Sequence, residues 1–180
     1  PPFGMYCIKS GIVKVTQVGP DGKESIVRLA KPGDTVGHRS LFSEQSYKAT
    51  ATAVQDTKVC FYDKKYIQKL VKEEPSVSYN LISALGKDLG AAETRLTSFS
   101  QKNVRERLAE LLLVLKEAYG EDQGERIKLN IKLTREEMAS MIGTASETLI
   151  RFFTEFKNEE IIEQEGKVIF ITNQEKLIDF

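Results

Sequence analysis

The stretch L-T-R-E-E-M-A-S-M-I-G-T-A-S-E-T-L-I-R-F-F-T-E-F-K-N-E-E-I-I, residues 133–162, predicts two short helices joined by a tight turn. Thr134 followed three residues later by Glu137 is a capping box, which starts the first helix. Gly143 supplies the permissive backbone that ends it. The apolar face of this helix consists of Met138, Met141 and Ile142, with the small Ala139 beside them. Together the two helices have the pattern of a helix-turn-helix.

The second helix of this stretch has two distinct faces. One is an apolar stripe with a 3.6-residue period, made of Leu149, Phe152, Phe153 and Phe156. The other carries Glu147, Ile150, Arg151 and Thr154. An acid, an arginine and a small apolar group on one exposed face suit the reading of base edges in a major groove.

A structural alternative exists for the same residues. Two amphipathic helices with a glycine turn also occur in helical domains that never touch DNA. Glu147 would then be the acid of a second capping box that begins at Thr144, and Arg151 a solvated ion-pair partner of Glu155. The rest of the chain has to decide between the two interpretations.

Length and composition indicate a soluble globular protein. The 180 residues suffice for one large or two small domains, and 41% hydrophobic and 29% charged residues are ordinary values. No apolar run reaches the length of a membrane helix, and no signal segment opens the chain. We therefore expect a cytoplasmic protein without membrane contact. Because Pro1 leads straight into a strand-like run without an initiator methionine, the sequence also looks truncated at its N-terminus.

The charges do not favour nucleic acid by themselves. Net charge is zero, and residues 100–180 hold twelve Lys/Arg against sixteen Asp/Glu. Any phosphate contacts must therefore come from a local basic edge and not from a general positive field.

Catalytic and metal sites are not expected. Cys7 and Cys60 lie in strand-like runs, which predicts buried, unpaired thiols. Two cysteines alone cannot hold an iron–sulfur cluster. His38 is the only histidine, so we expect a surface or pocket-lining residue and not a metal ligand. No nucleophile–base pair is present, and the protein is not expected to be an enzyme.

The first third of the chain predicts an antiparallel barrel or sandwich. Short β-rich runs alternate with turn residues, and the runs are residues 5–8, 12–15, 26–29, 50–54 and 58–62. Asp63 then caps a helix over residues 64–72, and Pro75 is placed to begin the next.

The following long helix, residues 76–99, carries an apolar seam with alternating spacings of three and four. The seam consists of Ile82, Leu85, Leu89, Ala92, Leu96 and Phe99. Such a seam prefers burial against a copy of itself, which predicts a homodimer. Packing of the helix on its own barrel is the alternative, but the barrel cannot cover both the seam and the adjacent stripe of Leu81.

A domain boundary is expected between residues 99 and 100, where Ser98-Phe99-Ser100 breaks the periodicity. Ser100 is predicted to cap a helix over residues 102–119. Residues 120–124 are predicted to form a loop and residues 127–131 a strand. After the helix-turn-helix, residues 161–162 and 168–171 flank Glu165-Gly166-Lys167 as a hairpin, which completes a winged helix.

This order of elements resembles the Crp/Fnr superfamily, the catabolite-activator and fumarate-nitrate-reductase regulators. The resemblance covers the whole chain. It is most specific in G-D-T-V-G-H-R-S-L-F (residues 33–42), N-V-R-E-R-L-A-E-L-L (residues 103–112) and residues 134–151. It implies an α+β protein with an antiparallel, jelly-roll β-roll of the cyclic-nucleotide-binding type over residues 1–99, including the dimerisation helix. A winged helix-turn-helix domain would span residues 100–180. The family has two further strands before the point where this chain begins.

The resemblance also implies DNA contacts. It places Thr134, Arg135 and Thr148 on phosphates, and Glu147 and Arg151 on base edges. Ser146 stands where activators of the family have an arginine, and Ile150 precedes Arg151. Lys167, in the hairpin turn, is a further candidate contact. The expected target is an inverted repeat of double-stranded DNA with half-sites that contain T-G-A, and RNA polymerase is an expected partner if the protein is an activator.

The effector pocket departs from the cyclic-AMP-binding members. His38, Lys48 and Ala49 replace the glutamate, arginine and serine that hold the nucleotide, and Ala92 replaces a threonine of the long helix. Arg39 is a further pocket candidate. Cyclic AMP is therefore disfavoured, whereas an apolar or anionic metabolite, haem, or no ligand stay open. The competing hypothesis is a ligand-binding module that acts through protein contacts without reading DNA.

Overall fold

The computed structural model describes all of residues 1–180, which form two compact units, Pro1–Arg95 and Leu96–Phe180. The division lies inside one continuous helix, α3 (Pro75–Gln101), whereas the sequence predicts the boundary after residue 99.

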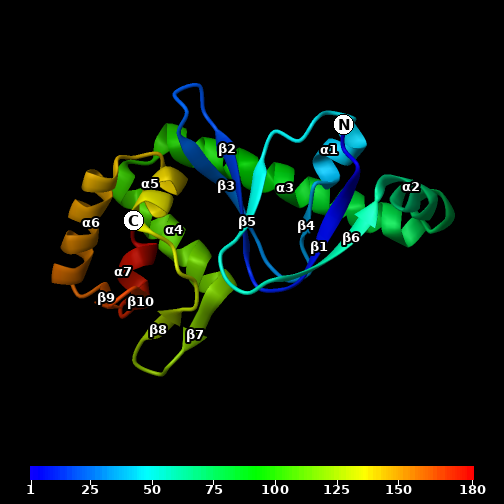
Figure 1. Ribbon diagram of the computed structural model, residues 1–180. Coiled ribbons are helices and arrows are strands. Elements are labelled where there is room, and N and C mark those ends of the chain that lie inside the picture. Colours follow the sequence, from blue (N-terminus) through cyan, green and yellow to red (C-terminus); the bar gives the residue numbers. More distant parts are fainter. The chain divides into compact units, whose positions relative to one another are not determined.

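Unit 1 is a roll of two antiparallel three-stranded sheets, as predicted (Figure 1). Their strand orders are β4–β1–β6 and β3–β2–β5. The strands are β1 (Gly4–Ser10), β2 (Val13–Val18), β3 (Glu24–Ala30), β4 (Thr35–Val36), β5 (Thr50–Ala53) and β6 (Lys58–Asp63). Buried Ile8, Val13 and Ala30 form one core cluster, to which Val36 adds from β4. The short β4 was not anticipated from the sequence.

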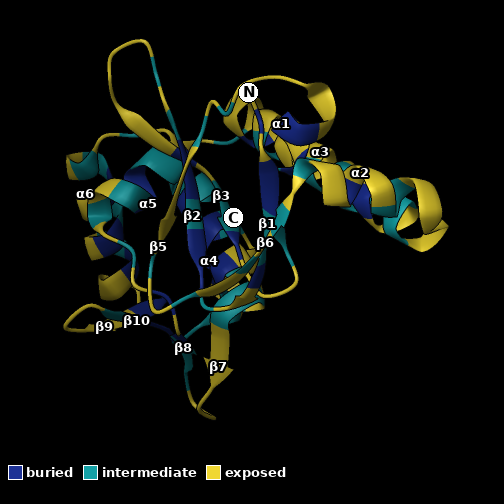
Figure 2. Ribbon diagram, turned by 45° about the vertical axis from the view of Figure 1, so that its right-hand side comes forward, coloured by how far each residue is buried: buried dark blue, intermediate teal, exposed yellow.

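Three helices accompany the roll: α1 (His38–Ser43), α2 (Lys64–Glu73) and the first part of α3. The side chain of Asp63 accepts a hydrogen bond from the amide of Tyr66, which confirms the predicted cap of α2. The helices are joined to the β4–β1–β6 sheet by a second core cluster, made of Met5, Leu41, Ile67 and Leu81. In Figure 2, β1 is largely buried whereas most of α2 is exposed. Helix α1 lies in a segment for which the sequence predicts no helix.

The predicted apolar seam of α3 is uncovered within one chain. Ile82 is 68% exposed, Leu89 60% and Leu96 71%. Leu85 is half-buried, and Ala92 and Phe99 are also exposed. Leu81, on the adjacent stripe, is buried in the core of unit 1. The barrel therefore covers one face of α3 and leaves the seam open.

Two predictions about the end of α3 were wrong. The helix does not end at residues 98–100 but continues to Gln101, and Ser100 does not cap the next helix. Both serines lie within the helix. The Ser98 hydroxyl donates to the carboxylate of Glu110, and the Ser100 hydroxyl donates to the carbonyl of Thr97. Asn103 caps α4 (Val104–Tyr119) in a full capping box.

Unit 2 is a winged helix-turn-helix, as predicted. Its remaining elements are β7 (Gly120–Asp122), β8 (Ile127–Leu129), α5 (Arg135–Ile142), α6 (Ser146–Asn158), β9 (Ile162–Glu165), β10 (Val168–Ile171) and α7 (Gln174–Ile178). The strands form a sheet in the order β7–β8–β10–β9, and the β9–β10 hairpin is the wing. Residues 120–122 were predicted as loop, but they pair with β8 because the chain doubles back after α4. Helix α7 was also not anticipated.

The turn between α5 and α6 is closely packed. Gly143 has a left-handed backbone with φ 63°, and a Cβ there would come within 2.7 Å of the Phe99 ring. Arg107 stacks its guanidinium 5.3 Å from the centre of the same ring. Its Nε also donates to the carbonyl of Ile142 at 2.8 Å. The last turn of α3 therefore rests directly on the helix-turn-helix.

We expect Gly143→Ala to destabilise unit 2 by more than backbone strain alone. Gly124→Ala is the matched control, because Gly124 also has a positive φ of 87° but no atom lies within 4 Å of the place that a Cβ would take there. The strain should cost about 1–2 kcal/mol at either site, and the clash with Phe99 should add roughly 1–3 kcal/mol at Gly143 only. Urea unfolding measures the difference. An equal loss of unfolding free energy in the two variants would show that the Phe99 ring moves aside without cost.

Candidate functional site

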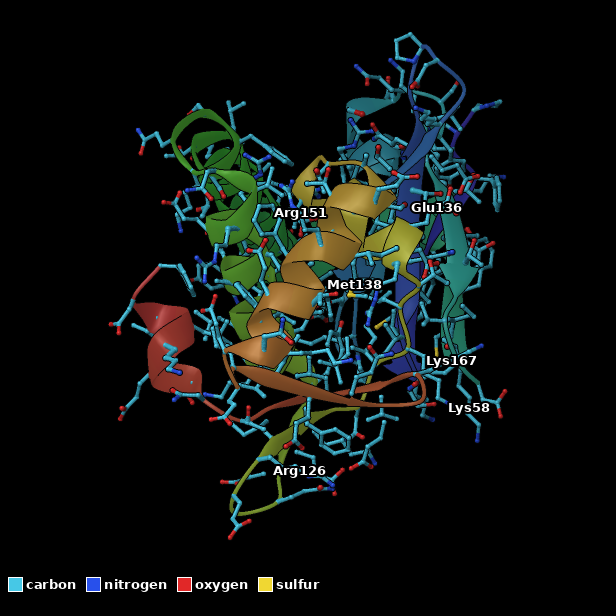
Figure 3. The ribbon with its side chains drawn as sticks, turned by 90° about the vertical axis from the view of Figure 1, so that its left-hand side faces the viewer. Lys58, Arg126, Glu136, Met138, Arg151 and Lys167 are labelled. Carbon is cyan, nitrogen blue, oxygen red and sulfur yellow. The ribbon has the colours of Figure 1, made fainter.

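The outward face of α6 presents the side chains that the sequence singled out. Glu147, Ile150, Arg151 and Thr154 are all exposed. On the opposite face, Leu149, Phe153 and Phe156 are buried, whereas Phe152 is only half-buried. Figure 3 shows Arg151 on this helix and Met138 among the side chains between α5 and α6. The folded core therefore holds α6 by its aromatic face and leaves the polar face free.

The structural alternative for these residues is realised only in part. The N-cap of α6 is Ala145, which has no side-chain cap bond, so the second capping box from Thr144 does not form. Arg151 Nε lies 3.9 Å from Glu155 Oε1 on the exposed surface. A pair of this kind contributes about 0.3–0.5 kcal/mol at most. Glu155 is therefore a weak competitor for the Arg151 guanidinium.

The N-terminus of α5 carries the predicted capping box and a constrained arginine. Thr134 accepts from the amide of Glu137, whose carboxylate accepts from the amide of Thr134. Arg135 is half-buried, with its guanidinium 3.7 Å from the centre of the Phe153 ring. Its Nη2 donates to Gln164 Oε1 of β9 at 2.5 Å. Burial lowers the pKa of Arg135, but from a value so high that the group stays charged. Arg135 thus braces the wing against α6 in addition to any contact it makes outside.

The other predicted contacts differ in exposure. Ser146 and Thr148 are half-buried in the first turn of α6. Lys167 is exposed in the wing turn, next to Gly166. Lys167 and Arg151 are therefore the two exposed cations among the candidates.

Arg126 was missed from the sequence. It lies on the strand side of the wing, where its Nη1 is 3.0 Å from Glu163 and 2.6 Å from Glu165. Its guanidinium stacks 3.9 Å from the centre of the Phe170 ring. The pairing halves the negative charge of two acids of the wing strand β9, which repel a polyanion. Nothing in the sequence signals this, because 37 residues separate Arg126 from Glu163.

Unit 1 contains a cavity of about 200 Å³ that is partly open to solvent. Four of the residues that the resemblance assigns to an effector pocket are among its lining: His38, Arg39, Lys48 and Ala49. Ala92 does not line it and is instead exposed on α3. Apolar walls are supplied mainly by Val15, Val27, Val36 and Ala51.

One wall of this cavity is a polar network that reaches α3. Arg28 of β3 donates to both carboxylate oxygens of Asp88, at 2.5 and 2.7 Å, and also to the carbonyl of Thr35. His38 is 98% buried, with Nδ1 2.9 Å from the Thr35 hydroxyl. Its Nε2 lies 3.2 Å from Asp88 Oδ2, but outside hydrogen-bonding direction, so it has no hydrogen-bond partner. The carboxylate next to it favours the tautomer that carries the proton on Nε2.

A second arginine ties α3 to the same strand. Arg95 donates from α3 to the carbonyls of Ile26 and Val27, at 2.9 and 3.3 Å. Arg28 extends from β3 to Asp88 of α3, and Arg95, two helical turns after Asp88, extends from α3 to the backbone of β3. Sequence reasoning missed both ties, because each joins residues about sixty or more positions apart.

No helix is long and apolar enough to cross a membrane. No group of three or more His, Cys, Asp or Glu side chains is arranged to hold a metal ion.

Comparisons with known proteins agree with this geometry. Residues 1–74 match the sequence model of the cyclic nucleotide-binding domain, and residues 106–180 match that of the Crp-like helix-turn-helix domain. The chain is 28% identical to the CRP-like cAMP-activated global transcriptional regulator of Mycobacterium tuberculosis, over 96% of this chain and 77% of that protein. A CooA mutant from Carboxydothermus hydrogenoformans is 28% identical with a TM-score of 0.81, covering 98% of this chain and 78% of that one. FixK2 from Bradyrhizobium japonicum shares the fold, with a TM-score of 0.84 at 23% identity over 99% of this chain and 87% of that one.

We expect His38 to make folding stability depend on pH near neutrality. Burial, and then the positive charge of Arg28, lower the pKa of His38, with Asp88 acting in the opposite direction. A histidine with a lowered pKa binds fewer protons in the folded than in the unfolded chain. Its contribution is therefore lost as the pH falls below the unfolded pKa of about 6.5 towards the folded value.

The measurement is urea unfolding between about pH 7.5 and 5.5, a window in which His38 is the only titrating side chain of ordinary pKa. Wild-type protein should lose stability across it. His38→Gln, which stays neutral, should be less stable overall but nearly independent of pH. The same slope in both proteins would contradict a buried, neutral His38.

Proposed function

The chain belongs to the Crp/Fnr family of DNA-binding transcription regulators, and on this premise we propose a homodimer that reads an inverted-repeat operator through α6 under the control of a small effector in unit 1. The observation that carries the proposal is the divided surface of α6. Its aromatic face is buried, and the Glu147, Ile150 and Arg151 face is exposed at 3.6-residue spacing. A module that acted only through its ligand pocket would have no need for such a face.

Dimerisation is supported by the uncovered seam of α3. Four large apolar side chains along it are exposed in a single chain: Ile82, Leu89, Leu96 and Phe99. Burial of one such side chain contributes about 1.5–3 kcal/mol. A parallel pairing of two α3 helices would cover these four side chains on both helices. It would also relate the two copies of unit 2 by a two-fold axis.

Base reading is assigned to two residues one helical turn apart. Arg151 can donate to O6 and N7 of a guanine together, and Glu147 can accept from a cytosine amino group. Ile150 is placed to meet a thymine methyl. These partners suit a half-site that contains T-G-A. With a two-fold axis between the two α6 helices, the half-sites would lie about 34 Å apart.

Backbone contacts are assigned to the residues around this face. Thr134, Thr148, Ser146 and Lys167 are the candidates, together with Arg135. Because Arg135 already stacks on Phe153 and bonds to Gln164, its phosphate contact would come from whichever guanidinium N–H groups remain. Arg126 pairs with two acids of the wing and reduces their negative charge, so the positive charge of Lys167 at the turn is less opposed.

The effector would occupy the cavity of unit 1, next to the network that ends on α3. Lys48 lacks the guanidinium fork that suits a cyclic phosphate, and Ala49 and His38 lack the hydroxyl and carboxylate expected for cyclic AMP. We therefore propose an effector other than cyclic AMP. Micromolar binding of cyclic AMP in calorimetry, with tighter operator binding, would contradict this. Residence in the cytoplasm and contact with RNA polymerase, if the protein activates, complete the proposal.

The dimer is tested by Leu89→Lys. The substitution places a charge in the middle of the seam, and an unpaired buried charge is strongly unfavourable. Sedimentation should show monomers, while circular dichroism shows an intact fold, because Leu89 is exposed in the single chain. The matched control is Val114→Lys, at a similarly exposed position on α4 that is not part of the seam, which should remain dimeric. A dimer that persists in Leu89→Lys would exclude the seam as the interface.

Base reading is tested by Arg151→Ala against Lys167→Ala. Loss of Arg151 should cost about 1–3 kcal/mol per half-site and relax the preference at the guanine position. Loss of Lys167 should weaken all sequences alike and reduce the salt slope by about 1. The measurement is binding to operators that carry each base at that position, over a range of salt. If wild type and Arg151→Ala discriminate equally, Arg151 is not the reader, and its pair with Glu155 is the better account.

A further inference from the structure

All sulfur atoms of unit 1 converge on one face of one strand pair. Strands β1 and β6 run side by side (Figure 1). Cys7 of β1 lies directly opposite Cys60 of β6 in the antiparallel register, and Met5 opposite Tyr62. Because side chains alternate along a strand, Met5 and Cys7 point to the same face, and Cys60 joins them there. These three are the chain's two cysteines and one of its three methionines. The sequence predicted two buried, unpaired thiols, but the thiols are half-buried neighbours.

The register shows how far apart the two cysteines are. The amide of Ile8 donates to the carbonyl of Asp34, and the carbonyl of Ile8 accepts from the amide of Gly33. The backbone groups of Ile8 therefore face β4, and those of Cys7 face β6. Cys7 and Cys60 are consequently a hydrogen-bonded pair, with Cα atoms about 5.5 Å apart and Cβ atoms at the wide end of the roughly 4.5–5.5 Å range.

This spacing suits a bridging atom better than a disulfide. A disulfide needs Cβ atoms about 3.5–4.5 Å apart, so direct oxidation would require the two strands to approach each other. An ion with metal–sulfur bonds of about 2.3 Å, the zinc–thiolate value, spans sulfur atoms up to roughly 4.6 Å apart without such movement.

The remaining ligands select the kind of ion. Met5 is 6% exposed and packs against Leu41, Ile67 and Leu81, and it lies two positions before Cys7 on the same face of β1, so its thioether is a buried donor next to the two half-exposed cysteines. His38 is occupied by Thr35 and faces Asp88, and no group of three His, Cys, Asp or Glu side chains comes together. Zinc, magnesium and calcium therefore lack a ligand set, whereas thiolate and thioether sulfur select Cu(I).

We propose that Cys7, Cys60 and Met5 form a binding site for a soft monovalent cation, Cu(I), with two thiolate ligands and the thioether as the third. On binding, two S–H bonds break and three copper–sulfur bonds form, two to the thiolates and one, through a sulfur lone pair, to the thioether of Met5. Both protons pass to solvent, and neither copper nor sulfur changes oxidation state. The flexible methionine side chain can turn its sulfur towards the ion without moving the strand.

The surroundings fit a site that is filled by an ion and not oxidised. Burial, then the neighbouring Cys60 thiol and the Asp34 carboxylate, raise the pKa of Cys7. A thiol that stays protonated reacts slowly with peroxides, and metal binding must displace its proton. This site does not depend on the proposed DNA-reading function, and its test uses no DNA.

The test is a competition for Cu(I) between the reduced, full-length chain and the chromophoric chelator bicinchoninate, without oxygen. We expect one Cu(I) per chain. Cys7→Ser and Cys60→Ser should each lower the affinity by at least about 100-fold and Met5→Leu by roughly 10-fold. Met138→Leu is the matched control, because it makes the same volume-conserving change at a buried methionine of unit 2 and should leave the affinity unchanged.

A second measurement uses the wild-type protein alone, so it does not depend on the variants folding. One equivalent of Cu(I) should protect both cysteines from alkylation by iodoacetamide, as read by peptide mass spectrometry. Protection of only one cysteine, or binding that survives Cys60→Ser, would overturn the proposal. So would rapid formation of a Cys7–Cys60 disulfide with glutathione disulfide, since that would show the two sulfur atoms in direct reach of each other.

Discussion

The uncovered seam of α3 is the constraint on which the rest of the structure depends. One face of this helix is fixed to the roll by Leu81 in the core and by two arginine ties, Arg28 to Asp88 and Arg95 to the β3 backbone. The other face leaves Leu89 and Leu96 in water. A helix that is held so firmly on one side cannot turn its seam inwards. The apolar surface therefore faces outwards, where a second chain could cover it.

The polar ties give the helix a second property. Asp88 belongs to α3, yet its carboxylate is held by Arg28 and faces the orphaned Nε2 of His38 in the cavity wall. Whatever binds in that cavity meets the same atoms that hold the helix. At the far end of α3, Phe99 rests on Gly143 in the turn before α6. Through Asp88 at its middle and Phe99 near its C-terminal end, α3 thus contacts one candidate functional element in each unit, which provides one physical basis for coupling between them. How large that coupling is depends on differential binding to two states and not on the contacts alone.

The sequence predicts most of the fold because its signals are local. The capping box at Thr134, the glycine at Gly143 and the cap at Asp63 each act within a few residues, and all three form as expected. The exposed face of α6 follows from helical periodicity in the same way. Ser100 failed as a cap because its hydroxyl bonds back to Thr97, a choice between two local partners that composition does not settle. The residues that were missed act over long separations: Arg28 with Asp88, and Arg126 with the wing. The resemblance assigns Ala92 to the pocket, but in the single chain Ala92 is exposed on α3 and does not line the cavity.

The central claim is that two α3 seams pair and so place two α6 helices on successive major grooves. The most direct measurement compares an operator whose half-site centres lie about one helical turn apart with one lengthened by about five base pairs. The insertion turns the second half-site to the opposite face of the duplex. The account predicts that affinity falls to that of a single half-site, and that Leu89→Lys binds both operators equally weakly. Equal, tight binding of the wild-type protein to both spacings would contradict it.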